Sequence, residues 1–241
     1  MGNAAPAYKR VLLKLSGEAL GGESGRGLDF DVIREVCGSV RACMELGVQV
    51  GIVTGGGNYW RGLKDGGGRM ERTRADQMGM LATMMNSLAM AEALEQVGVS
   101  ARVMTNLEMP RVAETYCVGR AMHHLEKGRA VIFGGGSGNP FFSTDSAAAL
   151  KAAEIGADIL LMAKNIDGVY TADPGTDPTA VRIDTITYDR ILEEHLKVID
   201  STAASLLRDN DIPTMIFALD PPENIRRVVL GERIGTIVRQ A

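Results

Sequence analysis

The sequence predicts an α/β protein, a three-layer α/β/α sandwich built on a mainly parallel central sheet. Short apolar segments alternate with segments of helical periodicity along the whole chain, which is the pattern of βαβ units. Glycine accounts for 29 of the 241 residues and often marks where one of these segments stops. The chain is 45% hydrophobic, which is enough apolar material for one domain over residues 1–241.

The expected strands are short apolar runs, often rich in β-branched residues and followed by a glycine or a turn. The first run, Val11 to Leu15, precedes Gly17, and the second ends at Gly55-Gly56-Gly57. In chain order, we expect strands over 10–16, 48–54, 100–105, 129–133, 158–163, 213–219 and 234–238. A turn-rich stretch over 165–180 separates the last two of these strands from the others.

The expected helices have apolar residues at every third or fourth position, as at Val32, Val36, Val40 and Met44. Glycine follows several of them as a stop signal. In chain order, we expect helices over 29–46, 76–97, 119–127, 144–156, 189–209 and 222–230. Because strands and helices alternate, their connections are right-handed crossovers and the helices cover both faces of the sheet.

Composition excludes several classes of protein. The net charge is −4 and the isoelectric point is about 5.5, whereas a nucleic-acid or membrane-surface binder carries a basic excess. Three cysteines without a CxxC pair do not indicate a disulfide scaffold or a thiolate zinc site. No apolar run approaches the ~18 residues of a membrane-spanning helix. These features favour a cytoplasmic protein.

Three glycine-rich loops follow expected strands: 14–22, 55–62 and 134–142. Ligands of open α/β sheets bind beyond the carboxyl ends of the strands, and glycine lets backbone N–H groups approach a phosphate closely. A single loop of this kind is often an ordinary turn, but three together favour a phosphate site. The P-loop, the complete GxGxxG pattern and the protein-kinase motifs are absent from the sequence, so phosphate binding requires another design.

Two cations and two carboxylates lie in or beside these loops, and each has an alternative structural role. Lys14, in an apolar strand, is either a phosphate-binding cation or an ammonium that reaches water at the strand end. Arg61 either grips phosphate oxygens or lies on the surface. Asp145 either acts at the site or caps the helix that follows. Asp76 is either functional or an acid favoured in the first helical turn.

Other residue types that often carry function are assigned structural roles. The methionines between residues 78 and 90 indicate core or interface packing rather than a metal site. Arg69, Arg72 and Arg74 fit a solvated loop, and His123-His124 fit a surface helix without a role. The cysteines are expected to be buried small hydrophobic residues.

Six segments carry a resemblance to a known family: KLSGEAL, GGGNYWRG, RADQMGMLATMMN, GNPFFSTDSAA, AKNIDGVYTADP and GTIV. From about Tyr8 to Arg239, the chain resembles the bacterial uridylate (UMP) kinases of the amino acid kinase superfamily. The resemblance implies the amino acid kinase fold and transfer of the γ-phosphoryl group of ATP to UMP, which gives UDP in pyrimidine nucleotide biosynthesis. It also implies an acceptor-binding lobe over about 8–163 and an ATP-binding lobe over about 164–241.

The resemblance further assigns roles to individual residues. The catalytic residues would be Lys14, Arg61 and Asp145. ATP would contact Lys14, Leu15, Ser16, Gly17, Gly57, Arg61, Asn165, Tyr170 and Asp173. UMP would contact Gly56, Asp76, Ser137, Gly138, Asn139, Pro140, Phe141, Phe142, Ser143 and Thr144. The effector GTP would bind Gly22, Glu23, Ser24, Gly25, Arg26 and Gly27. Lys164-Asn165 departs from another branch of the family, which has Thr-Lys there.

The family is homohexameric, cytoplasmic and Mg²⁺-dependent, with GTP as activator in many members and UTP as inhibitor. No protein metal site is expected, because Mg²⁺ would be carried by the ATP phosphates. Two other interpretations remain open: a superfamily kinase that phosphorylates a carboxylate or carbamate, and a non-catalytic binder or nucleotide-sensing regulator. A UMP acceptor needs no general base, because its second pKa is about 6. This agrees with a sequence that has no convincing Ser/His/Asp or Cys/His constellation.

Overall fold

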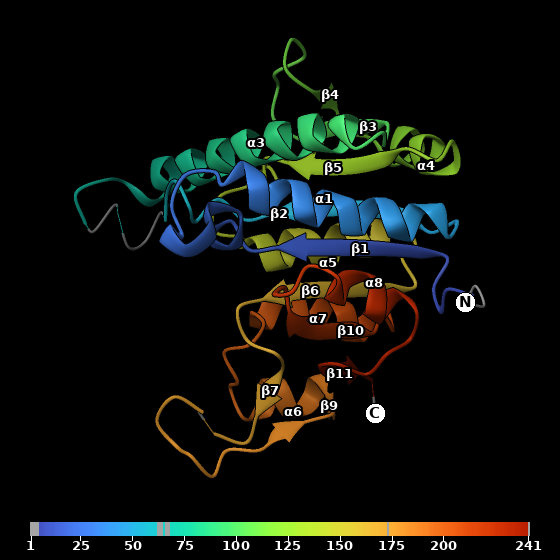
Figure 1. Cartoon of the computed structure of the whole chain (residues 1–241). Coiled ribbons are helices and arrows are strands. Elements are labelled where there is room, and N and C mark those ends of the chain that lie inside the picture. The colour runs from blue at the N-terminus through green and yellow to red at the C-terminus, as the bar shows by residue number, and fades with distance from the viewer. Residues whose placement is uncertain (1–4, 62–64, 66–67, 173, 241) are drawn as a thin grey trace.

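The computed structural model describes residues 5–61, 65, 68–172 and 174–240. A nine-stranded sheet with the order β4-β3-β5-β2-β1-β6-β10-β11-β9 forms its centre (Figure 1). Neighbouring strands are parallel except for β10 and β11. The strands are β1 Arg10–Leu15, β2 Gln49–Thr54, β3 Ala101–Thr105, β4 Glu114–Thr115, β5 Ala130–Gly134, β6 Ile159–Lys164, β9 Thr185–Thr187, β10 Thr214–Ala218 and β11 Thr236–Arg239.

Helices cover both faces of the sheet, as the sequence predicts (Figure 1). One apolar core contains residues of α1 Phe30–Glu45, α3 Arg72–Gln96 and α8 Asn224–Val229. The other contains residues of α4 Val118–Glu126, α5 Thr144–Glu154, α6 Tyr188–Glu193 and α7 Ser201–Asp209. Within β1, Leu13 and Leu15 belong to the first core and Leu12 to the second. This alternation is the two-residue period of a strand buried on both faces.

Two expected helices differ from the structure by more than one or two residues at an end. The segment 189–209 is divided into α6 and α7, because Thr187 and Asp200 each cap a separate helix with their side chains. His195, between the two helices, has a φ of 50°. The helix expected to begin near residue 76 begins at Arg72 instead. Arg72 and Arg74 are therefore helical, and the prediction that they lie in a solvated loop is wrong.

Several short elements were not expected from the sequence. A 3₁₀ helix, η1 Glu18–Ser24, follows β1. In the turn-rich stretch, β7 Val169–Tyr170 forms an antiparallel hairpin with β8 Arg182–Ile183, which lies just beyond that stretch. The strands β4 and β9, at the two edges of the sheet, have two and three residues. Segments of this length are too short to show a hydrophobic period.

Two predictions about exposure are wrong. His124 is buried, and its ring nitrogens lie 3.0 Å from Glu114 Oε2 and 3.0 Å from Arg129 Nη1. Cys117 is exposed at the N-cap of α4, whereas Cys37 and Cys43 are buried as expected. No helix in the described part of the chain is long and apolar enough to span a membrane.

The parallel register brings the glycine-rich loops to one edge of the sheet. Lys14 of β1 pairs with Val53 of β2 and with Met162 of β6, so these strands end side by side. β5 lies on the other side of β2. The arrowheads of β1 and β5 point toward the side of Figure 1 where η1 lies. The candidate site is therefore at the carboxyl edge, where open α/β sheets bind ligands.

Candidate active site

Two ammonium groups flank one carboxylate at the carboxyl edge of the sheet. Lys14 Nζ lies 2.9 Å from Asp145 Oδ1, and Lys164 Nζ lies 3.6 Å from Asp145 Oδ2. The lysines come from the adjacent strands β1 and β6, and Asp145 is the second residue of α5. The side chains of Lys14 and Asp145 are only 10% and 15% exposed. The cluster carries a net positive charge in a desolvated place.

The two lysines determine the charge state of Asp145. Burial by itself raises the pKa of this carboxyl, but the ammonium groups of Lys14 and Lys164 outweigh it and hold the pKa below its ordinary value. Burial lowers the pKa of Lys164, and attraction to Asp145 opposes this effect. The Lys164 ammonium also donates to the backbone carbonyl of Val198. Asp145 is therefore a carboxylate at neutral pH, held between the two cations.

A second carboxylate, Asp200, holds the start of α5. Its oxygens accept hydrogen bonds from the hydroxyls of Ser143 and Ser146 and, at 2.9 Å, from the backbone N–H of Ala203. The N-cap of α5 is Ser143, whose hydroxyl accepts from the N–H groups of Asp145 and Ser146. Asp145 does not cap this helix, and the capping alternative for it is wrong. Its carboxylate is free to face the two lysines.

The first two glycine-rich loops touch each other. A Cβ on Gly17 would lie 2.6 Å from the carbonyl oxygen of Gly55, so only glycine allows this approach. Asn86 of α3 fixes the contact: its amide donates to the Gly55 carbonyl at 2.6 Å and pairs with Asn58 at 2.8 Å. Asn58 in turn donates to the Gly27 carbonyl at 2.6 Å. The predicted ATP and effector segments are thus joined through one buried asparagine pair.

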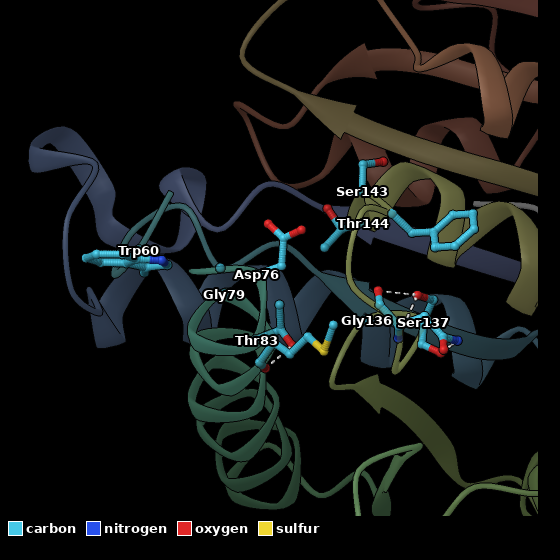
Figure 2. A pocket seen from close by; sticks show the side chains of 12 residues that line it. Trp60, Asp76, Gly79, Thr83, Gly136, Ser137, Ser143 and Thr144 are labelled. Atoms are coloured by element: carbon cyan, nitrogen blue, oxygen red, sulfur yellow. Dashed lines mark hydrogen bonds between the residues drawn. The ribbon is translucent and has the colours of Figure 1, made fainter. Parts of the chain in front are cut away.

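One cavity of about 170 Å³ lies between α3 and the third glycine-rich loop. Seven of the ten predicted UMP residues line it: Gly56, Asp76, Ser137, Asn139, Phe142, Ser143 and Thr144. The remaining three, Gly138, Pro140 and Phe141, belong to the same loop but do not line the cavity. Trp60, Gly79, Met80, Thr83 and Gly136 complete the lining. In Figure 2, Asp76 lies between Trp60 and the Ser143–Thr144 pair.

The walls of this cavity are held by hydrogen bonds. The indole N–H of Trp60 donates to the carbonyl of Ala75 at 2.9 Å. The Thr83 hydroxyl accepts from the N–H of Gly135 at 2.8 Å, which ties the third loop to α3. Asp76 lies in the second turn of α3, because that helix begins at Arg72. Its alternative role as a first-turn acid is therefore wrong.

A second cavity, of about 620 Å³, brings the predicted effector segment together with predicted ATP residues. Gly22, Glu23, Ser24, Gly25 and Arg26 line it, and so do Gly57, Arg61 and Asn165. Arg61 forms an ion pair with Glu18 of η1. A phosphate group in this cavity would have to compete with Glu18 for the guanidinium.

The other predicted ATP residues are less concentrated. Leu15 is buried in a core, and its carbonyl accepts from the N–H of Gly55 at 2.9 Å. The carbonyls of Ser16 and Gly17 accept from Ala19 and Leu20 of η1. Tyr170 lies on the hairpin and donates its hydroxyl to Asp167 at 2.7 Å. Asp173 lies outside the described residues.

Sequence reasoning missed several residues of this region. Lys164 ends an apolar strand before Asn165, and its ammonium reaches Asp145 only because β6 lies beside β1. Asn58 and Asn86 are 28 positions apart and show no joint pattern. Trp60 and Thr83 also line the cavity, although the sequence analysis gives neither residue a role. Lys164 could have been found by the same pattern as Lys14, because each is a lysine near the end of a buried strand.

The arrangement is suited to phosphate chemistry. Lys14 and Lys164 are cations beside glycine-rich backbone, and the N-terminus of α5 adds positive potential near Asp145. Among the described residues, no group of three or more His, Cys, Asp or Glu side chains has metal-site geometry. Such a site can neutralise and align phosphoryl groups, which is what phosphoryl transfer needs most from a protein.

Fold and site together define a member of the amino acid kinase family, and the chain belongs to it: the family model matches residues 9–218. The chain is similar to a UMP kinase from Bacillus anthracis at 38% identity and a TM-score of 0.93, with 96% of each chain covered. It is similar to a UMP kinase from Ureaplasma parvum at 36% identity and a TM-score of 0.91, with 96% of this chain and 99% of that chain covered. A uridylate kinase from Archaeoglobus fulgidus is 30% identical, with a TM-score of 0.70 and coverages of 95% and 99%.

Proposed function

We propose that this protein is a UMP kinase, which transfers the γ-phosphoryl group of ATP to UMP and produces UDP for pyrimidine nucleotide biosynthesis. The observation that carries the proposal is the pairing of Lys14 and Asp145 beside a cavity lined by the GNPFFST loop. Similarity over nearly the whole length of two bacterial UMP kinases supports it. The decisive experiment is a coupled assay of ADP release with UMP as acceptor.

The acceptor would occupy the cavity between α3 and the loop after β5. Ser137, Asn139 and Thr144 offer polar groups there, and the Asp76 carboxylate can accept hydrogen bonds from ribose hydroxyls. The N-terminal lobe, about 8–163, would hold UMP, and the C-terminal lobe, about 164–241, would hold ATP. Asn165, Tyr170 and Asp173 are the proposed contacts on the adenine and ribose side, and Leu15, Ser16, Gly17 and Gly57 are proposed beside the ATP phosphates.

The reaction needs alignment and neutralisation of charge more than covalent help from the protein. The UMP phosphate is a dianion near neutral pH, since its second pKa is about 6, and it can attack the γ-phosphorus directly. Lys14 would contact the transferring phosphoryl group, and Arg61 would leave Glu18 to bind phosphate oxygens. Asp145, held ionised between two ammonium groups, would orient Lys14 toward that group.

Mg²⁺ is proposed as the cofactor that enters with ATP. When bound, it neutralises charge on the β- and γ-phosphates. The donor set of the chain fits an ion held mainly by phosphate and water: both Asp145 oxygens face ammonium groups, and Asp200 accepts from two hydroxyls and an amide. Few protein ligands are needed for such an ion.

Regulation, assembly and location are also proposed. GTP would act as activator at Gly22–Gly27, and UTP would act as inhibitor. The chain would assemble as a homohexamer in which the exposed apolar face of α3 is buried. This face consists of Met78, Leu81, Met85 and Leu88. The enzyme would work in the cytoplasm, where thiols such as Cys117 stay reduced.

A further inference from the structure

Two contacts join α3 to the loop between β5 and α5, and a third, within α3, connects the two helix residues that make them. Arg72 Nε donates to Asp76 Oδ2 at 2.7 Å, and the backbone N–H of Phe141 donates to the same oxygen at 2.8 Å. The Arg72 guanidinium also lies over the Phe141 ring, with Cζ 5.3 Å from the ring centroid. Arg72, Asp76 and Phe141 thus form a closed triangle at the rim of the acceptor cavity. We call this triangle the rim latch.

The conformation of Phe141 indicates that the rim latch is under functional constraint. Its φ is 72°, in the left-handed region that bulky residues avoid. Its side chain is 65% exposed, so core packing does not hold it in this conformation. The N–H bond to Asp76 and the guanidinium above the ring are the contacts that do. Strained residues of this kind cluster at ligand clamps, where the surrounding structure maintains them.

The geometry also leaves one oxygen of the Asp76 carboxylate, Oδ1, available to a ligand. Both contacts use Oδ2, and within the described residues no hydrogen bond or ion pair engages Oδ1. Asp76 lines the cavity, and its side chain is 15% exposed. Arg72 itself does not line the cavity, so it acts on a ligand only through Asp76 and Phe141. An ion pair through one oxygen fixes the direction of the other oxygen.

We propose that Arg72 is a positioning residue for the acceptor. It directs Asp76 Oδ1 toward the acceptor hydroxyls and holds the loop residues on both sides of Phe141, including Asn139 and Phe142, against the cavity. This inference rests on the proposed function for the identity of the acceptor, a ribonucleoside monophosphate. Loss of Arg72 weakens binding of the acceptor and leaves donor binding unchanged, because no residue of the rim latch lines the second cavity, where the predicted ATP residues Gly57, Arg61 and Asn165 lie.

The test compares Arg72→Ala with Arg74→Ala, a matched control. Arg74 is exposed on the same helix, carries the same charge and belongs to no contact of the rim latch. Trp60, the single tryptophan, lines the cavity and reports UMP binding by fluorescence. We expect Arg72→Ala to raise the Kd and KM for UMP about tenfold, with kcat and the KM for ATP within threefold of wild type. That factor corresponds to loss of one charged hydrogen bond.

Two further variants separate positioning from general loss of charge. Arg72→Lys keeps the charge but lacks the planar fork, so it should rescue UMP affinity only partly. In a double-mutant cycle, Phe141→Leu combined with Arg72→Ala should weaken UMP binding less than the sum of the two single changes. Additive effects in this cycle would contradict a shared rim latch. Urea unfolding of each variant shows that it is folded.

A second readout is independent of UMP. Without ligand, amide hydrogen exchange over residues 136–143 should be faster in Arg72→Ala than in wild type, and unchanged in Arg74→Ala. Equal exchange in all three proteins, or a UMP Kd of Arg72→Ala within twofold of wild type, would overturn the role of Arg72. Wild-type protein without any UMP response would instead contradict the proposed function, and the exchange experiment would still test the rim latch.

Discussion

At the scale of single residues, the site depends on how one carboxylate is shared. Asp145 faces Lys14 through one oxygen and Lys164 through the other, so it offsets the repulsion between a buried and a partly buried cation. A buried charge that loses its partner is strongly destabilising, whereas the intact group gives little net stability. Asp145 therefore places the Lys14 ammonium, and its removal would also destabilise the fold because the cations would lose their partner.

Replacing Lys14 by methionine tests whether its ammonium touches the transferring phosphoryl group. Methionine keeps most of the apolar stem, so we expect the variant to fold. Groups that stabilise charge in the transition state contribute ~10²–10³ in kcat, so kcat should fall by about that factor, more than KM rises. Steady-state kinetics with UMP and Mg-ATP measure this. The exposed Lys197, changed to methionine, is the control.

A kcat of Lys14→Met within threefold of wild type would contradict the catalytic role. Lys14 would then be a strand residue whose ammonium only reaches solvent. Lys14→Arg should restore little activity, because a guanidinium cannot occupy the position of a compact ammonium.

Replacing Asp145 by asparagine tests the charge arrangement through pH. The variant should lose ~3–5 kcal/mol of unfolding free energy at pH 7, because the buried Lys14 ammonium and the partly buried Lys164 ammonium lose their partner. The pKa of Asp145 is lowered in the folded state, so its contribution is complete above the unfolded pKa, near ~3.9, and is lost as pH falls through the lower folded value. Urea unfolding at several pH values should therefore show the difference shrinking only below about pH 4.

A difference between wild type and Asp145→Asn that stays constant down to pH 3, or that is absent at pH 7, would contradict this account of the cluster. Ser143→Ala, which removes the α5 cap without removing the charge, provides a comparison that should not follow this pH dependence.

Functional residues can be predicted from the sequence when the signal lies in the neighbouring residues, and not when it depends on a partner far along the chain. Lys14 and Asp145 could be predicted as site residues because each stands beside a glycine-rich segment. Lys164 could not be placed, since its partner, 19 positions earlier, meets it only through the β1–β6 pairing. Arg72 was assigned to a loop because its contacts with Asp76 and Phe141 depend on where α3 begins.

At the scale of elements, the long helix α3 leaves an apolar face exposed. Met78, Leu81, Met85 and Leu88 are between 37% and 49% exposed and follow one another at helical spacing. Its opposite face packs against the sheet and ties the glycine-rich loops together through Asn86 and Thr83. A partner surface on the exposed face would complete the burial of this helix.

Replacing Met85 by glutamate tests this surface. A charge in the centre of an apolar interface is costly to bury, so the variant should sediment as a smaller species than the hexamer proposed for the wild type. Val181→Glu, which adds the same charge to an exposed apolar residue of the hairpin segment, should leave assembly unchanged. Analytical ultracentrifugation at micromolar concentration measures both. A wild-type monomer under these conditions would contradict the proposed assembly.

The elements themselves were predictable to different extents. The seven longer strands and most helices follow from apolar runs and their spacing, because each is long enough to show a period. The break between α6 and α7 was missed, since Thr187 and Asp200 are N-caps that resemble ordinary polar positions until the chain direction is known. The β7–β8 hairpin has two residues in each strand, too few for any pattern.

At the scale of the whole molecule, the proposed function requires that UMP is the phosphoryl acceptor. Hydrogen-bonding groups of the loop after β5 line one cavity, and a site built on such groups rejects an analogue with the opposite donor pattern. CMP differs from UMP in this way at its base edge, and its binding would leave buried polar groups unpaired.

The most direct measurement is a coupled assay of ADP release with Mg-ATP and, in parallel, UMP, CMP, aspartate, acetylglutamate or carbamate, each with and without GTP. We predict rapid ADP release with UMP, a kcat/KM for CMP at least 10²-fold lower, and no release above background with the other acceptors. Equal kcat/KM for UMP and CMP, or release with a carboxylate or carbamate acceptor and none with UMP, would contradict the account.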